Sequence, residues 1–243
     1  AGSVWRAKTD FTVTTLAAFV LSSGTAWRES GFVEDATWVS RATQTGYGDN
    51  DENAPFPRVD YNPAAAGTQS SPVYLFRGNF TIDDLAAVTA VTGQVRFDDS
   101  CAVYVNGTQV YRHGDLTANA PLTQYTADNG APTRENATAA LTVPLGLLTN
   151  GVNTIAVEVH QADAASSDVT FDLRLAATVA TGAADPGPFT LTATAGPLSA
   201  GRAVASLGTA AGTTVSGVLP AGTTTWSGLV RVSGDVTVPA GGV

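Results

Sequence analysis

The dipeptide Asn106-Gly107, set between two alternating apolar runs, constrains the fold of this chain more than any other feature. Asn-Gly is a strong signal for a two-residue type I′ turn, because both central positions need φ > 0. A turn of this kind places Val103 opposite Val110 when the pairing continues without interruption. The sequence therefore predicts a β-hairpin within residues 95–111.

The side chains of this segment alternate between two faces, as expected for strands. The alternation places the only cysteine, Cys101, on the apolar face, where we expect a small buried side chain and no internal disulfide. One face carries Val95, Phe97, Cys101, Val103 and Val105, and the other carries Arg96, Asp98, Ala102 and Tyr104.

Further runs of strand character occur along the chain, separated by turn residues. We expect strands at 72–82, 139–143, 152–160 and 168–177, and two short ones at 10–15 and 16–21. In the last of the four longer runs, Phe171, Leu173 and Leu175 share a face. Short strands at this spacing are typical of an all-β sandwich or barrel.

Composition and charge exclude several classes of partner. The chain has 243 residues, of which 44% are hydrophobic and 14% charged, so it is globular rather than disordered. Its formal net charge is −9, without a basic stripe, so we expect no nucleic-acid partner. No apolar run is long enough to predict membrane insertion. The lack of methionine leads us to expect a processed or excised piece of a longer protein.

The composition changes near residue 181. Residues 181–188, TGAADPGP, have the small, Gly- and Pro-rich character of a linker. Beyond them, residues 189–243 contain strand-like runs at 189–195, 213–219 and 229–238. We therefore predict a first domain over 1–180, a linker over 181–188, and the start of a second, truncated β domain over 189–243.

Five segments of the first domain carry a resemblance to a known family: AWRESGFVEDATW (26–38), GYGDND (46–51), YLFRGNFTID (74–83), RFDDSCAVYVNGTQVYR (96–112) and GVNTIAVEVHQADAASSDVTFDLRL (151–175). Together they resemble the galactose-binding-like jelly-roll modules of large secreted bacterial proteins, which accompany phosphoesterase, CotH-type, lamin-tail or β-helix domains. The usual Asp-Asp-Gly is here Asp98-Asp99-Ser100. Residues 223–243 are similar to the first rung of secreted right-handed β-helices.

This resemblance implies a jelly-roll β-sandwich without catalytic activity, because such modules are generally non-catalytic. It also implies a carbohydrate ligand and a structural Ca²⁺, which proteins of the same fold often bind. It also implies a secreted or cell-surface location, with other domains of the same polypeptide as partners. Fold alone does not transfer function, so the ligand has to be argued from the residues.

Adjacent carboxylates at Asp98 and Asp99 are the first candidate for a Ca²⁺ site, because Ca²⁺ gathers about six to eight oxygen ligands. The alternative is that both carboxylates cap turns. A second acidic cluster, Asp49, Asp51 and Glu52, lies in a long Pro-rich segment. It could hold Ca²⁺ or be solvated loop charge.

Four polar residues alternate with apolar ones in the two strongest strand patterns: Glu158, His160, Asp172 and Arg174. If these strands lie side by side, the four form a polar face that could bind a glycan. The alternative is a solvated face with ordinary cross-strand ion pairs. Trp27 could stack on a sugar ring, or it could pack in the core as a tryptophan near a strand usually does.

No catalytic motif is recognisable. The two histidines, His113 and His160, show no metal-ligand spacing, and the sequence has no nucleophile elbow and no phosphate-binding glycine loop. We expect a non-catalytic accessory or binding module with carbohydrate as its ligand. Two alternatives stay open: a structural spacer without a small ligand, or a non-catalytic part of a secreted hydrolase such as a phosphoesterase, with its active site elsewhere.

Overall fold

The computed structural model describes residues 3–50, 52–113, 116–126 and 137–180, and the backbone of two strands at 213–218 and 230–237. The chain divides into two compact units, Ala1–Val179 and Ala180–Val243. Each unit is described by itself below.

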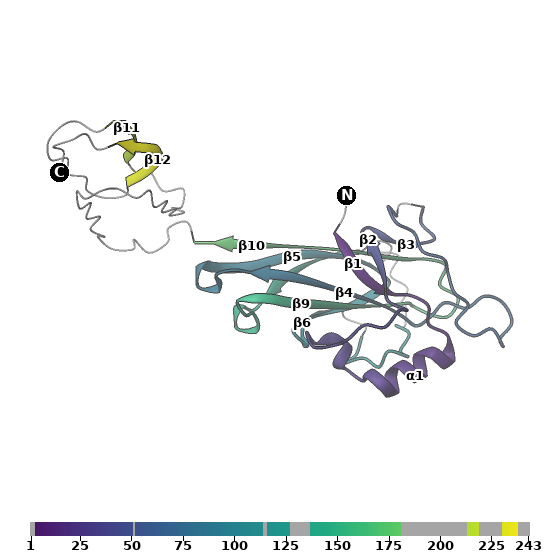
Figure 1. Ribbon diagram of the computed structural model, residues 1–243. Helices are drawn as coiled ribbons and strands as arrows, with labels where there is room; N and C mark the ends of the chain where they lie inside the picture. Colours follow the sequence, from purple (N-terminus) through teal and green to yellow (C-terminus); the bar gives the residue numbers. More distant parts are fainter. Residues whose placement is uncertain are drawn as a thin grey trace. The chain divides into compact units, whose positions relative to one another are not determined.

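Two antiparallel sheets pack face to face in the first unit (Figure 1). Sheet A has the order β2-β1-β4-β9-β6-β7, and sheet B has the order β3-β10-β5-β8. The strands of sheet A are β1 (Val4–Lys8), β2 (Val39–Ala42), β4 (Val73–Ile82), β6 (Ser100–Val105), β7 (Thr108–Arg112) and β9 (Gly151–His160). Those of sheet B are β3 (Thr45–Tyr47), β5 (Val88–Asp98), β8 (Ala137–Val143) and β10 (Val169–Val179). The predicted all-β sandwich is confirmed.

Aromatic and branched side chains fill the space between the sheets. Phe76 of sheet A stacks on Phe171 of sheet B with ring centroids 4.1 Å apart, and Trp5 meets Phe171 edge-on at 5.0 Å. The predicted apolar face of residues 95–105 is confirmed, since all five of its members belong to this core. The chain passes from sheet B to sheet A at Asp99, between β5 and β6.

The Asn106-Gly107 turn is confirmed, because both residues have positive φ angles of 47° and 83°. It joins β6 to β7 in the predicted register at its first two pairs. The predicted pairing of Val103 with Val110 is wrong: Val103 lies opposite Tyr111. The register shifts between Val103 and Tyr104, so that β7 has one extra residue, as in a β-bulge.

A helix replaces the two strands expected at 10–15 and 16–21. Helix α1 (Val13–Ser23) is capped by Thr12, whose side chain accepts from the amide of Thr15 while the Thr15 hydroxyl accepts from the Thr12 amide. This reciprocal pair satisfies donors that a helix start leaves open. Leu16 and Phe19, three residues apart, bury the inner face. In a strand, residues three positions apart point to opposite faces, so Leu16 and Phe19 would share no face.

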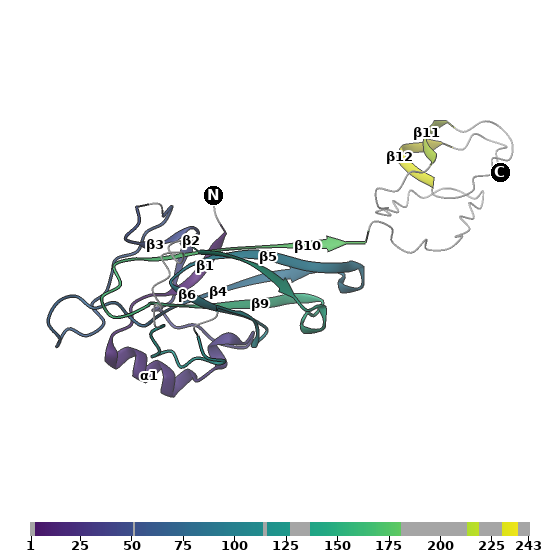
Figure 2. The same cartoon turned by 180° about the vertical axis from the view of Figure 1, so that it is seen from behind.

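A second apolar layer covers the outer face of sheet A, on the side where α1 lies (Figures 1 and 2). It includes the 3₁₀ turn η1 (Ala26–Arg28) and residues 116–122. Two further 3₁₀ turns, η2 (Leu85–Ala87) and η3 (Leu145–Leu147), flank strands elsewhere. The layer and sheet A bury Phe11, Leu16, Phe19, Trp27, Trp38, Val73, Leu75, Ala102, Tyr104, Leu116, Ala120, Leu122 and Ala156.

The second unit contains two described strands, β11 (Thr213–Val218) and β12 (Val230–Thr237), which pair in parallel. They lie within the predicted strand runs at 213–219 and 229–238. The linker at 181–188 and the strand at 189–195 lie outside the described residues, so the second β domain stays a prediction. None of the helices in the described part of the chain has the length and apolar character needed to cross a membrane.

Candidate ligand-binding face and carboxylate cluster

The outer face of sheet B carries a row of polar side chains on β5, β10 and β8. The register places Arg96 between Asp172 and Thr138, and places Gln94 beside Arg174. These five residues line an open hollow of about 320 Å³. Gln94, Thr138 and Arg174 are exposed, whereas Arg96 and Asp172 are partly buried.

Hydrogen bonds orient three of the side chains that line this hollow. Arg174 Nη2 donates to Gln94 Oε1 over 2.8 Å, and Arg96 Nη1 donates to Gln44 Oε1 over 2.8 Å. Because the oxygen of Gln94 accepts from Arg174, its amide N–H groups are directed to other partners. The hollow therefore presents planar polar groups in orientations set by the protein.

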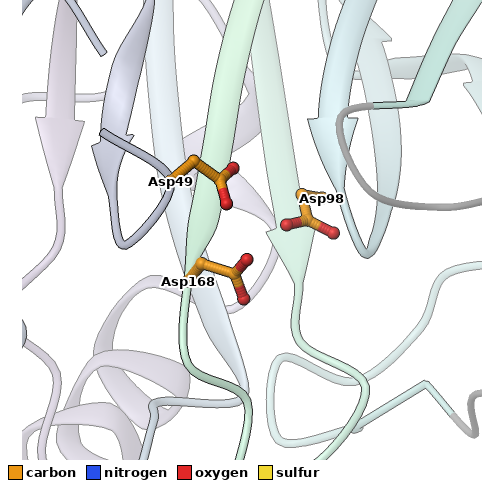
Figure 3. A group of neighbouring side chains, drawn as sticks. All are labelled: Asp49, Asp98 and Asp168. Atoms are coloured by element: carbon orange, nitrogen blue, oxygen red, sulfur yellow. The ribbon is translucent and has the colours of Figure 1, made fainter. Parts of the chain in front are cut away.

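Three aspartates meet at one end of sheet B (Figure 3). Asp49 follows β3, Asp98 ends β5, and Asp168 directly precedes β10. Since β10 lies between β3 and β5 and runs antiparallel to both, the end of β3, the start of β10 and the end of β5 lie at the same end of the sheet. The nearest oxygens of the three carboxylates lie within 4.8 Å of one another.

The backbone at Gly48 allows this close approach. A Cβ at Gly48 would lie 2.4 Å from the Cβ of Asp168, and the φ angle of Gly48 is +108°, which side chains other than hydrogen disfavour. Thr170 Oγ1 donates to Asp49 Oδ2 over 3.3 Å. Asp98 is buried, with 1% of its surface exposed, and lies opposite Thr170 in the register.

This cluster offers the oxygen ligands that a hard divalent cation prefers. Each of the three carboxylates has two oxygens of the type that Ca²⁺ prefers, and the Thr170 hydroxyl is adjacent. Bringing three negative charges together, one of them buried, costs electrostatic energy that a cation would offset.

The structure separates Asp99 from Asp98, the two residues predicted to share a metal site. Asp99 Oδ2 accepts from the Ala162 amide over 2.7 Å and from Ser166 Oγ over 3.3 Å. Asp99 thus holds the loop between β9 and β10. This is the turn-capping role that the sequence offered as the alternative to a Ca²⁺ ligand. Of the second predicted cluster, Asp49 joins Asp98, Glu52 accepts from the Asp49 amide at 3.4 Å, and Asp51 lies outside the described residues.

The four polar strand residues predicted to form one face fall on two different sheets. Asp172 and Arg174 lie on β10 and line the hollow of sheet B. Glu158 and His160 lie on β9 of sheet A, and neither has any exposed surface. They point away from the inter-sheet core as the alternation predicts, but the expectation of a solvent-accessible face is wrong for them, because the α1 layer covers that side of sheet A.

Glu158 is the centre of a buried polar network. Its Oε2 lies 3.0 Å from Arg28 Nη2, its Oε1 accepts from Tyr104 Oη over 2.8 Å, and His160 Nε2 lies 3.8 Å away. Burial works to raise the pKa of Glu158, but His160, Arg28 and Tyr104 together outweigh it and hold this pKa below its usual range. The network contributes to the structure rather than to an exposed site.

Trp27 has no exposed surface and belongs to the layer over sheet A. Its ring meets that of Tyr104 at 6.2 Å in an edge-on arrangement. The ring is therefore packed in the core, the alternative reading of this residue, and it is not available for stacking on a sugar.

Sequence reasoning missed Asp168 and the contribution of Gln94, Arg96 and Thr138 to the hollow. The alternation had placed Arg96 on the outward face, but only the strand order shows that β5 lies between β8 and β10. Asp168, directly before a strong strand pattern, was a signal only in combination with that order.

No protein-family model matches the chain, and no curated protein sequence matches it. Among solved structures, it is similar to the β-glucuronidase of Ruminococcus gnavus, with 12% identity and a TM-score of 0.40 over 65% of this chain and 20% of that chain. The same enzyme in complex with D-glucuronic acid gives 12% identity and a TM-score of 0.39 over 66% and 21%. This chain thus spans about a fifth of the length of that enzyme, and its function has to be argued from its own residues.

Proposed function

We propose that this chain is a non-catalytic binding module of a larger secreted or cell-surface protein, and that its ligand is a carbohydrate. The observation that carries the proposal is the hollow on the outer face of sheet B. It is open and has the volume of a small-ligand site, and it is lined by oriented guanidinium and amide groups together with a hydroxyl and a carboxylate.

These lining groups suit the hydroxyls of a sugar, each of which donates and accepts hydrogen bonds. Asp172 accepts, Arg174 donates, and the amide of Gln94 and the hydroxyl of Thr138 do both. The five residues come from three neighbouring strands, so the rigid sheet rather than a loop sets their positions.

The proposal assigns no catalysis to the hollow. Asp172 is the only carboxylate among the described residues that line it, whereas glycoside hydrolysis ordinarily uses a pair of carboxylates on either side of the bond. The other charged lining groups are the guanidiniums of Arg96 and Arg174, which offer hydrogen-bond donors and no acceptor.

The cofactor that we propose is a structural Ca²⁺ held by Asp49, Asp98 and Asp168. The support is the donor set, the burial of Asp98 and the convergence of three strand ends. Asp98 and Arg96 are two residues apart on β5, which is about 7 Å along a strand. A cation at the cluster would thus fix the end of the sheet next to the hollow.

A glycan array probed with the full chain, with and without EDTA, tests the proposal. We expect retention on a subset of glycans, a decrease of about 3- to 10-fold in Gln94→Ala, which removes hydrogen bonds, and no change in the matched control Gln109→Ala on β7. EDTA should lower retention by loosening the end of the sheet. Silence across the array would favour a structural spacer, and equal retention by Gln94→Ala would contradict the placement of the ligand.

A further inference from the structure

The charges of the hollow differ in sign from those of the whole chain. Two arginines and one aspartate line it among the described residues, a local surplus of one positive charge, while the chain carries a formal net charge of −9. Asp172 lies directly opposite Arg96 in the register. The surplus therefore falls on Arg174, which is exposed.

Arg174 and Gln94 form an end of the hollow that is rich in donors. The oxygen of Gln94 accepts from Arg174, which leaves the amide N–H groups of Gln94 and the remaining N–H groups of Arg174 as donors on one strand pair. A guanidinium with a neighbouring amide matches the paired oxygens of a carboxylate or a sulfate, and charge-assisted hydrogen bonds of this kind are about twice as strong as neutral ones.

The opposite end of the same face is negative. Asp98, in the carboxylate cluster, and Gln94 are four residues apart on β5, about 13 Å along a strand. This distance exceeds the screening length of about 8 Å at physiological ionic strength, so the cluster weakens the binding of an anion at Arg174 only slightly. An anionic ligand would thus be oriented, with its charged group at Arg174 and its hydroxyls toward Asp172.

We propose that the hollow binds a sugar that carries a carboxylate or a sulfate group, with the anionic group on Arg174 and Gln94 and the ring hydroxyls on Asp172 and Thr138. This inference rests on the proposed carbohydrate-binding function and adds the class of ligand.

Calorimetric titration of the full chain with matched pairs of probes tests it. Oligogalacturonate and its methyl ester differ at the carboxyl group alone, which is charged in the acid and neutral in the ester. Sulfated and unsulfated dextran oligosaccharides form the second pair. We expect at least one acidic probe to bind about tenfold more tightly than its neutral counterpart. That preference should decrease as NaCl is raised, because salt screens the charge. The acidic member that shows the preference identifies carboxylate or sulfate as the group recognised.

Variants assign the preference to these residues. Arg174→Gln should abolish it, whereas Arg58→Gln, which removes the same charge from a residue that does not line the hollow, should retain it. Asp172→Asn should raise the preference for the acidic member about threefold, as expected from one charge removed at about 7 Å in water, while the weaker bond to a ring hydroxyl affects both members alike. Circular dichroism checks that each variant is folded.

Four outcomes would overturn the inference. These are equal affinity for charged and neutral members, a preference that survives in Arg174→Gln, equal losses in Arg174→Gln and Arg58→Gln, and a smaller preference for the acidic member in Asp172→Asn. If neutral glycans bind at the hollow and acidic ones do not, the class of ligand is wrong and the proposed function stands. If no glycan binds, both fail.

Discussion

Arg28 Nη2 lies 3.0 Å from Glu158 Oε2, although the two residues are 130 positions apart in the sequence. Their side chains are buried, with 6% and 0% of their surface exposed. The pair joins η1 to the central strand β9 and so fastens the α1 layer to the outer face of sheet A. This layer covers the outer face of sheet A, whereas the described outer face of sheet B has a row of polar side chains and a hollow.

Replacing Glu158 by glutamine should lower the free energy of unfolding by about 3 kcal/mol or more, because Arg28 would stay buried without its counter-charge. Urea denaturation followed by tryptophan fluorescence measures this. The control Asp172→Asn alters a partly exposed carboxylate and should change stability by less than about 0.5 kcal/mol. A change below about 1 kcal/mol in Glu158→Gln would contradict a structural role for the pair.

The contribution of Glu158 should depend on pH in a definite direction. Its pKa in the folded state lies below the unfolded value of 4.5, so between these values the unfolded state binds the extra proton. Stability from this group is therefore present above pH 4.5 and is lost as the pH falls through the folded pKa. The difference in unfolding free energy between wild type and Glu158→Gln should be constant near neutral pH and shrink in acid. A difference that grows in acid would have the wrong sign.

Gly48→Ala should destabilise the first unit by more than about 2 kcal/mol. The new Cβ would lie 2.4 Å from the Cβ of Asp168, at a φ angle of +108° that L side chains rarely adopt. Gly146→Ala is the matched control, because a Cβ at Gly146 meets nothing within 4 Å and its φ angle is not positive. Thermal unfolding compares the two variants, and equal melting temperatures would contradict the close approach of β3 to β10.

Substitutions at Asp98 and Asp99 should differ in their effect on calcium binding. Millimolar CaCl₂ should raise the melting temperature of the wild type by about 5–10 °C when it exceeds Kd about a hundredfold, and should have no effect on Asp98→Asn. Asp99→Asn should lose about 1 kcal/mol by weakening the bond to the Ala162 amide, and should still respond to calcium. A wild type without a calcium response, or a response that Asp98→Asn retains, would contradict the proposed ion site.

Strands with a clear two-residue alternation could be predicted from the sequence. The turn at Asn106-Gly107, the inward face of residues 95–105 and the opposite faces of Phe171 and Asp172 all follow from local rules. The β-bulge near Val103 could not be predicted, because it changes the register without changing the hydrophobic pattern at the turn.

Helix α1 was missed because its signals are weak. Its apolar residues are consecutive rather than spaced, and its capping pair is Thr12 with Thr15, where the familiar pattern has glutamate or glutamine at the second position. With strands expected at 10–15 and 16–21, nothing in the sequence predicts a layer over sheet A. The burial of Glu158 and His160 follows from that layer alone.

The sequence predicts some of the residues of the candidate site and not others. Asp172, Arg174 and Asp98 were named from the sequence, but Asp168 and Gln94 required the strand order of sheet B. Strand order depends on contacts between residues far apart in the chain. The pairing of β5 with β10, for example, joins Gln94 to Arg174 across 80 positions.

Backbone amide chemical shifts, recorded while an oligosaccharide selected on the array is titrated into the full chain, test the central claim most directly. If the outer face of sheet B binds the ligand, the shifted amides will group on residues 92–96, on Thr138 and on residues 172–176, and Gln94→Ala will weaken the titration. Shifts that group on sheet A or on the α1 layer, with the amides of β5 and β10 unmoved, would contradict it.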